Sequence, residues 1–323
     1  MSGARIISYI LFSVSDLFMI DDNSKYNFAL LGGDRRQAVV AERLIERGHS
    51  VKTFGLGSFA AAINGVEICS TPEKAISGSN FVLLPLPVSK DKINLSFASD
   101  QSITPISLTS IVELAVKYGA KAIIGGIIPH EIERIAEING IEICDFYLDD
   151  KFQCLNALPS AEGALMLAME HTEITLEGMK ALVCGYGRIG SSLASLLKKL
   201  GATVTVAARS DAALCDASMS GYSLTRLDGY GYNLATAASN CDVVFNTVPA
   251  VIFGESILQK MTRYPLYIEI ASTPGGIDLS AAREKQMRVI FAPSIPGKYA
   301  PISAGEYIYE IVSDILNKRG IIL

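Results

Sequence analysis

The sequence predicts an α/β protein made of two Rossmann-like domains, each a doubly wound parallel sheet, with a cleft between them. Three observations carry this prediction. The chain of 323 residues is long enough for two domains, apolar runs alternate with segments of helical periodicity, and a G-x-G-x-x-G loop stands in the second half. Because continuous apolar strands are buried on both faces, the alternation favours parallel sheets covered by helices on each side.

Residues 27–157 are expected to form the first domain, after an N-terminal extension over residues 1–26. Within this domain, apolar runs that end at Gly or Pro alternate with segments of helical spacing. The predicted strands are 28–31, 51–54, 81–84, 122–124 and 141–144, and the predicted helices are 35–47, 108–118 and 129–138. The extension holds a mostly apolar stretch over 5–20, which is short for a bilayer span and is interrupted by Asp16, so no membrane segment is expected.

Residues 158–299 are expected to form the second domain, which begins with an interdomain helix over 159–171. A second series of strands and helices then follows. The predicted strands are 180–184, 203–207, 242–246, 266–270 and 288–291, and the first predicted helix of this series is 189–200. Residues 303–316 carry apolar side chains at helical spacing, so the C-terminal segment 300–323 is expected to form a helix that packs back on the first domain.

Composition and charge exclude several classes of protein. Half of the residues are hydrophobic and 19% are charged, which argues against a disordered chain. The net charge is −5, with Lys and Arg scattered along the sequence, so no basic face for nucleic acid is predicted. The six cysteines include no C-x-x-C pair, and the three histidines stand far apart. We therefore expect reduced thiols, no metal site and a cytoplasmic protein.

The loop at residues 185–190 carries the strongest functional signal. It consists of Gly185, Tyr186, Gly187, Arg188, Ile189 and Gly190, and the apolar run 180–184 leads directly into it. In such a unit the first glycine permits a tight turn, the second lets backbone approach a pyrophosphate, and the third lets the helix pack on the strand. Free N–H groups and the helix dipole then favour phosphate. We predict a nicotinamide dinucleotide site, and a glycine-rich turn without ligand is the alternative.

The end of the next predicted strand indicates which dinucleotide binds. An NAD site usually places an acidic residue there to bond the ribose 2′-hydroxyl, whereas this strand is followed by Arg209 and Ser210. A guanidinium can hold a 2′-phosphate through two bonds and a serine can add a hydroxyl, so NADP is predicted over NAD. Thr247 and Pro249 follow a later strand at the same edge and are expected beside the nicotinamide ribose. A solvated Arg209 and an ordinary turn at 247–249 are the alternatives.

Substrate-binding candidates lie at other predicted strand ends. Arg35 and Arg36 follow the first strand and Lys298 follows the last, so these cations are expected to bind an anionic substrate from opposite walls of the cleft. A surface position for Lys298, and an Asp34 that only caps the next helix, are the alternatives. The Gly275-Gly276 turn is a further place where backbone can approach a ligand.

The interdomain helix offers two candidates for proton transfer, Glu162 and His171. They lie nine residues apart, which places them on opposite faces of a helix that turns about 100° per residue. At most one of them therefore points into the cleft, and a surface or capping role is the alternative for both. The sequence identifies no catalytic base.

Seven segments of the sequence are similar to one known family. They are GGDRRQ (32–37), LPLPVS (84–89), NALPSAEGALMLAMEHTE (156–173), the glycine loop with VAARS (185–210), NTVP (246–249), ASTPGG (271–276) and APSIPGKYAPISAG (292–305). Through these segments the chain resembles the A subunits of dipicolinate synthase over nearly all of its length after residue 27. The P-x-x-E-G helix, together with the PGG and P-G-x-x-A-P segments, is much more specific than the glycine loop alone.

The resemblance implies a subunit that supplies a pyridine-nucleotide site and forms pyridine-2,6-dicarboxylate, the calcium chelator of bacterial spores, from a cyclic intermediate of the lysine pathway; with NADP predicted from Arg209, the subunit is expected to be NADP-dependent. It further implies a dicarboxylate substrate, a partner in the form of a smaller flavoprotein-like B subunit, and the mother-cell cytoplasm as location. Oxidation of a dihydropyridine is a hydride transfer driven by aromaticity, so the protein mainly positions donor and acceptor. Family members tend to carry lysine where this chain has Ile302, and no role of that lysine is transferred to Lys298.

Two other functions stay open at this point. One is a two-domain NAD(P)-dependent dehydrogenase of the 2-hydroxyacid type, a build that usually needs an arginine and a Glu–His pair near the nicotinamide ring. The other is a non-catalytic nucleotide-binding partner that positions or activates a B subunit. The sequence also leaves the oligomeric state open, a homo-oligomer included.

Overall fold

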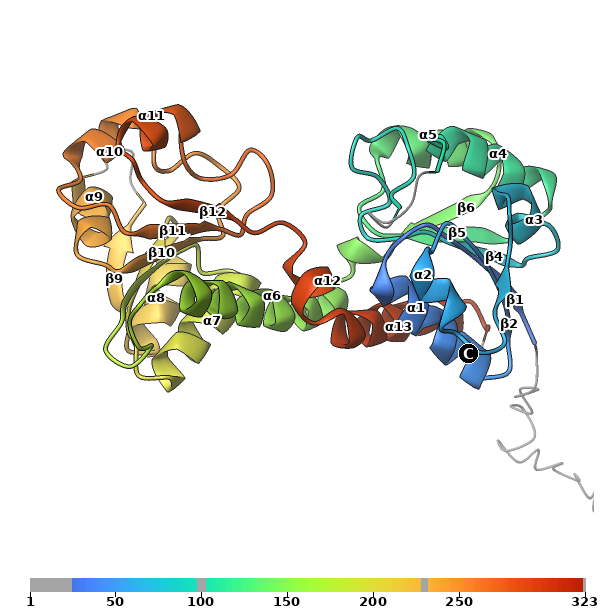
Figure 1. The fold of residues 1–323 in the computed structure, drawn as a ribbon, viewed down its shortest axis with the longest axis horizontal. Coiled ribbons are helices and arrows are strands. Elements are labelled where there is room, and N and C mark those ends of the chain that lie inside the picture. Colours follow the sequence, from blue (N-terminus) through green and yellow to red (C-terminus); the bar gives the residue numbers. More distant parts are fainter. Residues whose placement is uncertain (1–24, 98–102, 228–231, 322–323) are drawn as a thin grey trace, which may run out of the picture.

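The computed structural model describes residues 25–97, 103–227 and 232–321, so all but two residues of the predicted N-terminal extension lie outside it. The described chain forms two α/β halves with a long helical connection between them (Figure 1). Each half is built on a six-stranded parallel sheet.

The first half follows the order that a doubly wound sheet requires. Its strands run β3-β2-β1-β4-β5-β6. The strand order reverses between β1 and β4, because the chain first adds β2 and β3 on one side of β1 and then adds β4, β5 and β6 on the other. The strands are β1 (Asn27–Leu31), β2 (Ser50–Phe54), β3 (Glu67–Ile68), β4 (Phe81–Leu83), β5 (Ala122–Gly125) and β6 (Glu142–Asp145). The helices are α1 (Arg35–Glu46), α2 (Ser58–Ala61), α3 (Pro72–Ile76), α4 (Leu108–Lys117), α5 (His130–Ile138) and the 3₁₀ helix η2 (Phe146–Leu148).

The second half repeats this topology. Its strands run β12-β11-β10-β7-β8-β9, with the reversal between β7 and β10. The strands are β7 (Lys180–Cys184), β8 (Thr203–Ala208), β9 (Ser223–Arg226), β10 (Val243–Asn246), β11 (Leu266–Glu269) and β12 (Val289–Phe291). The helices are α7 (Arg188–Lys199), α8 (Asp211–Met219), α9 (Tyr232–Ser239), α10 (Glu255–Lys260) and α11 (Leu279–Glu284).

Apolar side chains cover both faces of each sheet. In the first half, the successive β1 residues Leu30 and Leu31 belong to different buried clusters on opposite faces. In the second half, Val183 and Cys184 of β7 are divided in the same way. The predicted fold class, two Rossmann-like α/β domains, is confirmed.

The helix that joins the halves is longer than the sequence predicted. It was expected over 159–171, but α6 (Asp150–His171) begins at Asp150, and the boundary predicted at 157/158 falls inside it. The helix was expected to begin at Pro159 because proline is common in the first turn of a helix, but Pro159 lies inside α6. The actual start is set by Asp149, whose side chain accepts hydrogen bonds from the backbone N–H groups of Lys151 at 2.8 Å and Phe152 at 3.2 Å.

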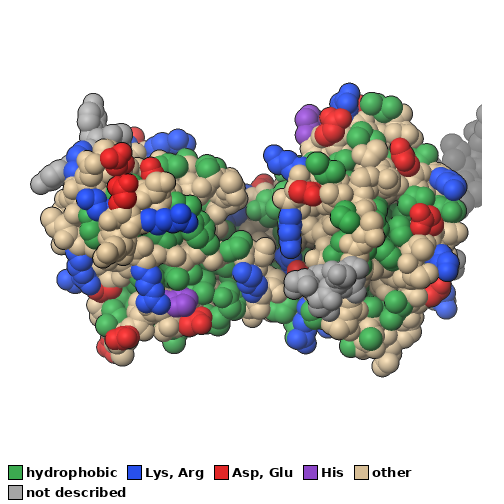
Figure 2. Space-filling view, turned by 45° about the horizontal axis from the view of Figure 1, so that its top comes forward, with side chains coloured by type: hydrophobic (Ala, Val, Ile, Leu, Met, Phe, Trp, Pro, Cys, Tyr) green, Lys and Arg blue, Asp and Glu red, His purple; other side chains and the backbone are tan. Residues whose placement is uncertain are grey.

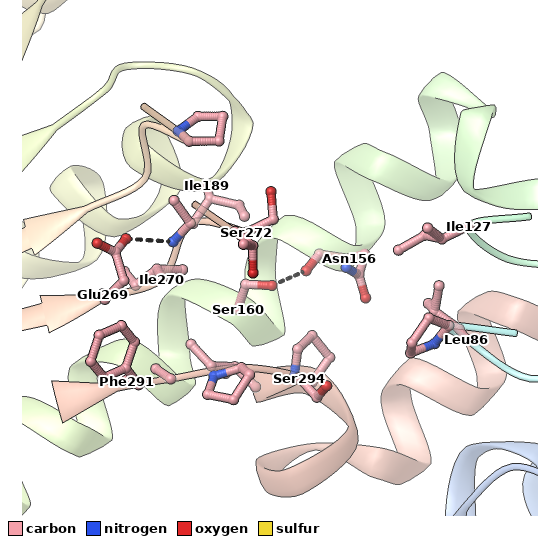
Figure 3. A pocket seen from close by; sticks show the side chains of 18 of the residues that line it. Leu86, Ile127, Asn156, Ser160, Ile189, Glu269, Ile270, Ser272, Phe291 and Ser294 are labelled. Atoms are coloured by element: carbon pink, nitrogen blue, oxygen red, sulfur yellow. Dashed lines mark hydrogen bonds between the residues drawn. The ribbon is translucent and has the colours of Figure 1, made fainter. Parts of the chain in front are cut away.

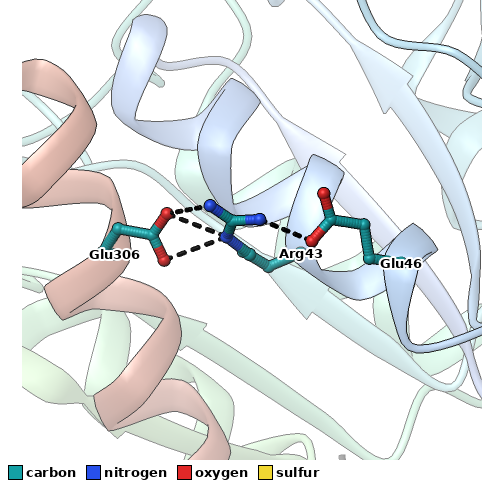
Figure 4. A network of polar contacts seen from close by, with 3 residues as sticks. All are labelled: Arg43, Glu46 and Glu306. Carbon is teal, nitrogen blue, oxygen red and sulfur yellow. Dashed lines mark hydrogen bonds and ion pairs between the residues drawn. The ribbon is translucent and has the colours of Figure 1, made fainter.

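The chain returns to the first half through α12 (Ile295–Tyr299) and α13 (Pro301–Asn317). Ile308 and Ile311 of α13 are buried in the same apolar cluster as Leu44 of α1. Arg43 of α1 adds a polar link, since it donates to Glu306 of α13 through Nε at 2.8 Å and Nη2 at 2.5 Å (Figure 4). The carboxylates of Glu306 and Glu46 raise the pKa of the Arg43 guanidinium.

The described part of the chain holds no helix that combines the length and the apolar character needed to span a membrane.

Candidate functional site at the cleft between the halves

The glycine loop has the geometry of a phosphate cradle. Gly185 follows β7 with φ of +92°, a conformation that L side chains rarely adopt. A Cβ on Gly190 would stand 2.1 Å from the Gly185 carbonyl oxygen, so only glycine lets α7 come this close to the loop. A Cβ on Gly187, in contrast, would meet nothing within 4 Å. Gly187 is the N-cap of α7 and brings no capping side chain, which leaves the first-turn N–H groups to an incoming phosphate.

A cavity of about 310 Å³ lies against this loop. One wall contains Gly185, Gly187, Arg188, Ile189 and Gly190, together with residues 247–249, and the other contains Tyr147, Gln153, Asn156 and Ala157. The hydroxyl of Thr247 donates to the Cys184 carbonyl at 2.8 Å, which fixes the 247–249 turn beside the loop. The Arg188 side chain crosses to α6, where it donates to Gln153 Oε1 at 2.6 Å and pairs with Asp150. Tyr186 instead packs its ring on Tyr222, 6.0 Å away.

Arg209 and Ser210 lie where the sequence placed them, directly after β8. Arg209 is exposed. The Ser210 hydroxyl accepts a hydrogen bond from the Ala213 N–H at 3.3 Å, so it serves as the N-cap of α8. A second arginine, Arg226 at the end of β9, was not predicted. It donates to the Arg209 carbonyl at 3.2 Å and pairs with Asp211.

A larger cavity of about 750 Å³ separates the two halves (Figures 2 and 3). Its lining comes from the first half (Arg36, Leu86, Pro87, Ser89, Lys90, Ile127, Tyr147), from α6 (Asn156, Ser160) and from the second half (Ile189, Thr247, Pro249, residues 269–275 and residues 291–296). Tyr147, Asn156, Ile189, Thr247 and Pro249 line both cavities, so the glycine loop opens directly into the cleft.

Only one residue of the predicted arginine pair lines the cleft. Arg36 is 6% exposed and donates to both carboxylate oxygens of Asp34, at 2.9 and 2.8 Å, and to the Leu86 carbonyl. Asp34 also caps α1 by accepting from the Arg36 N–H at 3.0 Å. Arg35 is exposed and is not among the residues that line either cavity.

The lysine in the cleft is Lys90 rather than Lys298. Lys298 is exposed on α12 and lines neither cavity. Lys90 follows the segment 84–89 at the carboxyl end of β4, the edge where ligands bind in open parallel sheets. The sequence signal for Lys90 was its position after the apolar strand 81–83. Six residues outside any helix or strand separate the lysine from that strand, so it was not recognised as a strand-end residue.

The two candidates on α6 lie away from the cleft. Glu162 is exposed, and His171 is the last residue of the helix. His171 contacts Arg288 twice, through its carbonyl oxygen at 2.8 Å from Nη1 and its Nδ1 at 3.1 Å from Nη2. Neither residue lines either of the two cavities, so the structure does not bring them together with the glycine loop.

Glu269, whose carboxylate lines the cleft at the end of β11, was not predicted as a site residue. Glu269 is 3% exposed. Burial raises the pKa of its carboxyl above the ordinary value of 4.5, and this outweighs the hydrogen-bond donors around it. A glutamate within the apolar run 266–270 was the signal that could have found it.

Two family models match the chain, one on each half. The model of the N-terminal domain of the dipicolinate synthase A subunit matches residues 27–147. The model of the S-adenosyl-L-homocysteine hydrolase NAD binding domain matches residues 160–289. The second match supports a nicotinamide dinucleotide as the cofactor of the glycine loop.

Individual relatives cover nearly the whole chain. The A subunit of dipicolinate synthase from Bacillus subtilis (strain 168) is 27% identical over 290 residues, which are 89% of this chain and 95% of that protein. The crystal structure of the same A subunit from Bacillus subtilis has a TM-score of 0.78 at 26% identity, and covers 91% of this chain and 97% of that one. The crystal structure of the Bacillus halodurans A subunit has a TM-score of 0.79 at 25% identity, with coverage of 90% and 97%.

A more distant structure shares the fold alone. The transhydrogenase from Sinorhizobium meliloti has a TM-score of 0.62 at 15% identity, and covers 90% of this chain and 94% of that one.

Proposed function

With its resemblance to the dipicolinate synthase A subunit confirmed, we propose that this chain is the NADP-dependent oxidoreductase subunit that forms pyridine-2,6-dicarboxylate from a cyclic dihydro or tetrahydro intermediate of the lysine pathway. One observation carries the proposal beyond the resemblance. The glycine loop opens into a cleft whose first-half wall holds a buried arginine and a lysine, which suits an anionic ring placed beside a dinucleotide.

The residues around the loop fit a dinucleotide. The open space over Gly187 and the uncapped start of α7 would receive the pyrophosphate. Thr247 and Pro249 line the passage into the cleft, which is where a nicotinamide ribose would lie. When bound, the nicotinamide ring accepts a hydride. Arg209, with Arg226 beside it, favours the 2′-phosphate of NADP, because Arg209 stands directly after β8, where NAD binders usually carry an acidic residue for the ribose hydroxyls.

The charged side chains of the cleft favour a substrate carboxylate on the first-half wall, opposite Glu269. The charged side chains among the described lining residues are Arg36, Lys90 and Glu269, with both cations on the first-half wall and the anion on the second. A ring dicarboxylate is therefore expected to turn one carboxylate toward Arg36 and Lys90. Arg36 is already fixed by Asp34 and the Leu86 carbonyl, so little side-chain freedom is lost when it binds substrate.

From the dihydro intermediate the reaction balances with one NADP⁺ as the oxidant, and from the tetrahydro intermediate it needs two. A dihydropyridine dicarboxylate gives up a hydride to NADP⁺ and a proton to solvent or a base, and the products are pyridine-2,6-dicarboxylate and NADPH. Aromaticity supplies the driving force, so the task of the protein is to hold the two rings in contact and limit water. The two halves, joined by α6 and by the return segment α12, form the walls that do this.

The 2-hydroxyacid dehydrogenase alternative finds less support in the cleft. That reaction needs a histidine near the nicotinamide, and all three histidines of this chain are described. His49 is buried, His130 and its partner Glu133 lie on α5, and His171 contacts Arg288. None of the three lines either cavity. A non-catalytic role beside a flavoprotein-like B subunit, in the mother cell of a sporulating bacterium, stays the second candidate, because the relatives are named as one subunit of a synthase.

An assay of the purified chain alone separates these functions. The cyclic lysine-pathway intermediate and NADP⁺ are mixed with the protein, and the absorbance of NADPH and of the pyridine product are followed together. Formation of both in equal amounts is the expected result. Formation of neither, together with activity once the B subunit is added, would assign this chain a supporting role. Oxidation of a 2-hydroxyacid in place of the cyclic intermediate would contradict the proposal.

A further inference from the structure

A buried polar pair ties together the two second-half loops that face the cleft. Asn246 ends β10 and Glu269 ends β11, and the two residues are partners in the parallel register of these strands. They are 0% and 3% exposed. Asn246 Nδ2 donates to Glu269 Oε1 at 2.7 Å, so the loops that follow the two strands start from one hydrogen-bonded point.

The Glu269 carboxylate holds the loop that follows its own strand. Its Oε1 accepts from the Ala271 N–H at 3.1 Å, and its Oε2 accepts from the Gly276 N–H at 2.7 Å. The Tyr267 hydroxyl lies 3.4 Å from Oε2 on the buried side. The carboxylate therefore closes residues 271–276 into a loop, and residues 271–275 of that loop line the cleft.

The Asn246 amide holds the other loop in the same way. Its Nδ2 donates to the Val248 carbonyl at 2.9 Å, and its Oδ1 accepts from the Val248 N–H at 3.1 Å. This loop carries Thr247 and Pro249, which line both cavities. Gly276 closes over the amide, because a Cβ at this position would stand 2.2 Å from Asn246 Nδ2.

We propose that Glu269, acting through Asn246 and the two loops, is a positioning residue that sets the distance between the nicotinamide side of the cleft and the ring substrate. The substrate part of this inference rests on the proposed function. The loop part does not, because the order of residues 271–276 can be measured without any substrate.

The requirement is for a group that only accepts hydrogen bonds. The two oxygens of Glu269 face three N–H groups, those of Asn246, Ala271 and Gly276, and an ionised carboxylate can accept from all of them. A glutamine has the same shape but turns an NH₂ group toward one of these donors, so at least one contact becomes repulsive. An aspartate keeps the charge and both acceptors, but withdraws them by one methylene. These two variants therefore separate the acceptor chemistry from the shape.

The experiment compares Glu269→Gln, Glu269→Asp and the control Glu284→Gln, which changes an exposed glutamate on α11. Hydrogen exchange followed by mass spectrometry reports peptides covering residues 270–277 and residues 185–190. Glu269→Gln is expected to speed exchange in 270–277 by about tenfold or more, with 185–190 unchanged. Glu269→Asp is expected to recover part of the protection, and Glu284→Gln to match the wild type.

Kinetics then test the consequence for the substrate. Glu269→Gln is expected to lower kcat and leave the affinity for NADPH within about twofold, with partial recovery of kcat in Glu269→Asp. Unchanged exchange in 270–277, or equal acceleration in both peptides, would overturn the inference, since the first shows that the carboxylate does not hold the loop and the second shows general loosening of the fold. Altered exchange in a chain that makes no pyridine product would retain the loop assignment and reject the proposed function.

Discussion

Gly297 lies against the guanidinium of Arg36, so that a Cβ at position 297 would stand 3.0 Å from both Cζ and Nε of the arginine. This contact places the start of the return segment, α12, directly on the buried cation of the first half. Asp34 and the Leu86 carbonyl hold the guanidinium from other sides, so it has little room to move.

Gly297→Ala is therefore expected to lower the free energy of unfolding by about 1–3 kcal/mol, the usual cost of overpacking a site that cannot relax. Urea unfolding followed by circular dichroism measures it. The matched control is Gly254→Ala, because a Cβ there meets nothing within 4 Å and its φ is −75°. Equal stability of the two variants would show that Arg36 yields to the added methyl group.

Lys90 and Lys298 form a pair of exposed lysines that differ in whether they line the cleft. Lys90→Ala is expected to raise KM for the cyclic substrate about five- to tenfold, the scale of one solvent-exposed charged contact, with little change in stability. Lys298→Ala is expected to leave KM unchanged. Steady-state kinetics at two salt concentrations measure both, and the Lys90 effect should shrink at high salt. A larger effect of Lys298→Ala than of Lys90→Ala would show that Lys298 of α12 contacts the substrate carboxylate instead.

Gly187 and Gly190 test the phosphate cradle because only one of them has room for a side chain. Gly187→Ala is expected to change stability by no more than about 1 kcal/mol, since the space over it is open, yet to weaken dinucleotide binding at least about tenfold by filling that space. Gly190→Ala is expected to lower both stability and binding, because its Cβ meets the Gly185 carbonyl. Calorimetric titration with NADPH, paired with urea unfolding, measures the contrast. Full NADPH affinity in Gly187→Ala would place the pyrophosphate elsewhere.

Arg209 tests the choice between the two dinucleotides. Its side chain is exposed after β8, and removal of a guanidinium from a 2′-phosphate should weaken NADPH by roughly ten- to a hundredfold while NADH changes little. Titration of wild type and Arg209→Ala with both reduced cofactors, followed by fluorescence, gives the ratio. The neighbouring Arg226→Ala variant shows how much of the preference comes from the second arginine. Tighter binding of NADH than NADPH by the wild type would reject NADP.

Glu269 gives the protein a pH-dependent stability of defined sign. Burial raises the pKa of this carboxyl in the folded state above its ordinary value of 4.5, so the folded protein holds the proton more tightly than the unfolded chain. The resulting contribution to stability is fully present below pH 4.5 and is lost as the pH rises through the raised pKa. Urea unfolding at a series of pH values should show this loss in the wild type and a flatter curve in Glu269→Gln. Parallel curves for the two proteins would assign the dependence to other groups.

The sequence alone determined the features that depend on local chemistry. The glycine loop, the strand before it and the arginine after β8 were all predicted from neighbouring residues, because a tight turn and a close helix–strand contact restrict which side chains fit at each position. Burial of strands on both faces likewise leaves a continuous apolar run in the sequence. The proposed substrate class came from the family resemblance, because no local pattern contained it.

Only the tertiary structure decided which charges face the cleft. Arg35 and Arg36 are adjacent in sequence, but they lie on different sides of α1. Arg35 is exposed, whereas Arg36 is buried against Gly297. Lys90 enters the cleft and Lys298 does not, although both follow strand ends. The start of α6 was set by the capping Asp149 rather than by Pro159. Glu269 shows why local patterns miss such features: its N–H donors come from residues 246, 271 and 276, and only the adjacent β10 and β11 strands and the returning loop bring them to one carboxylate.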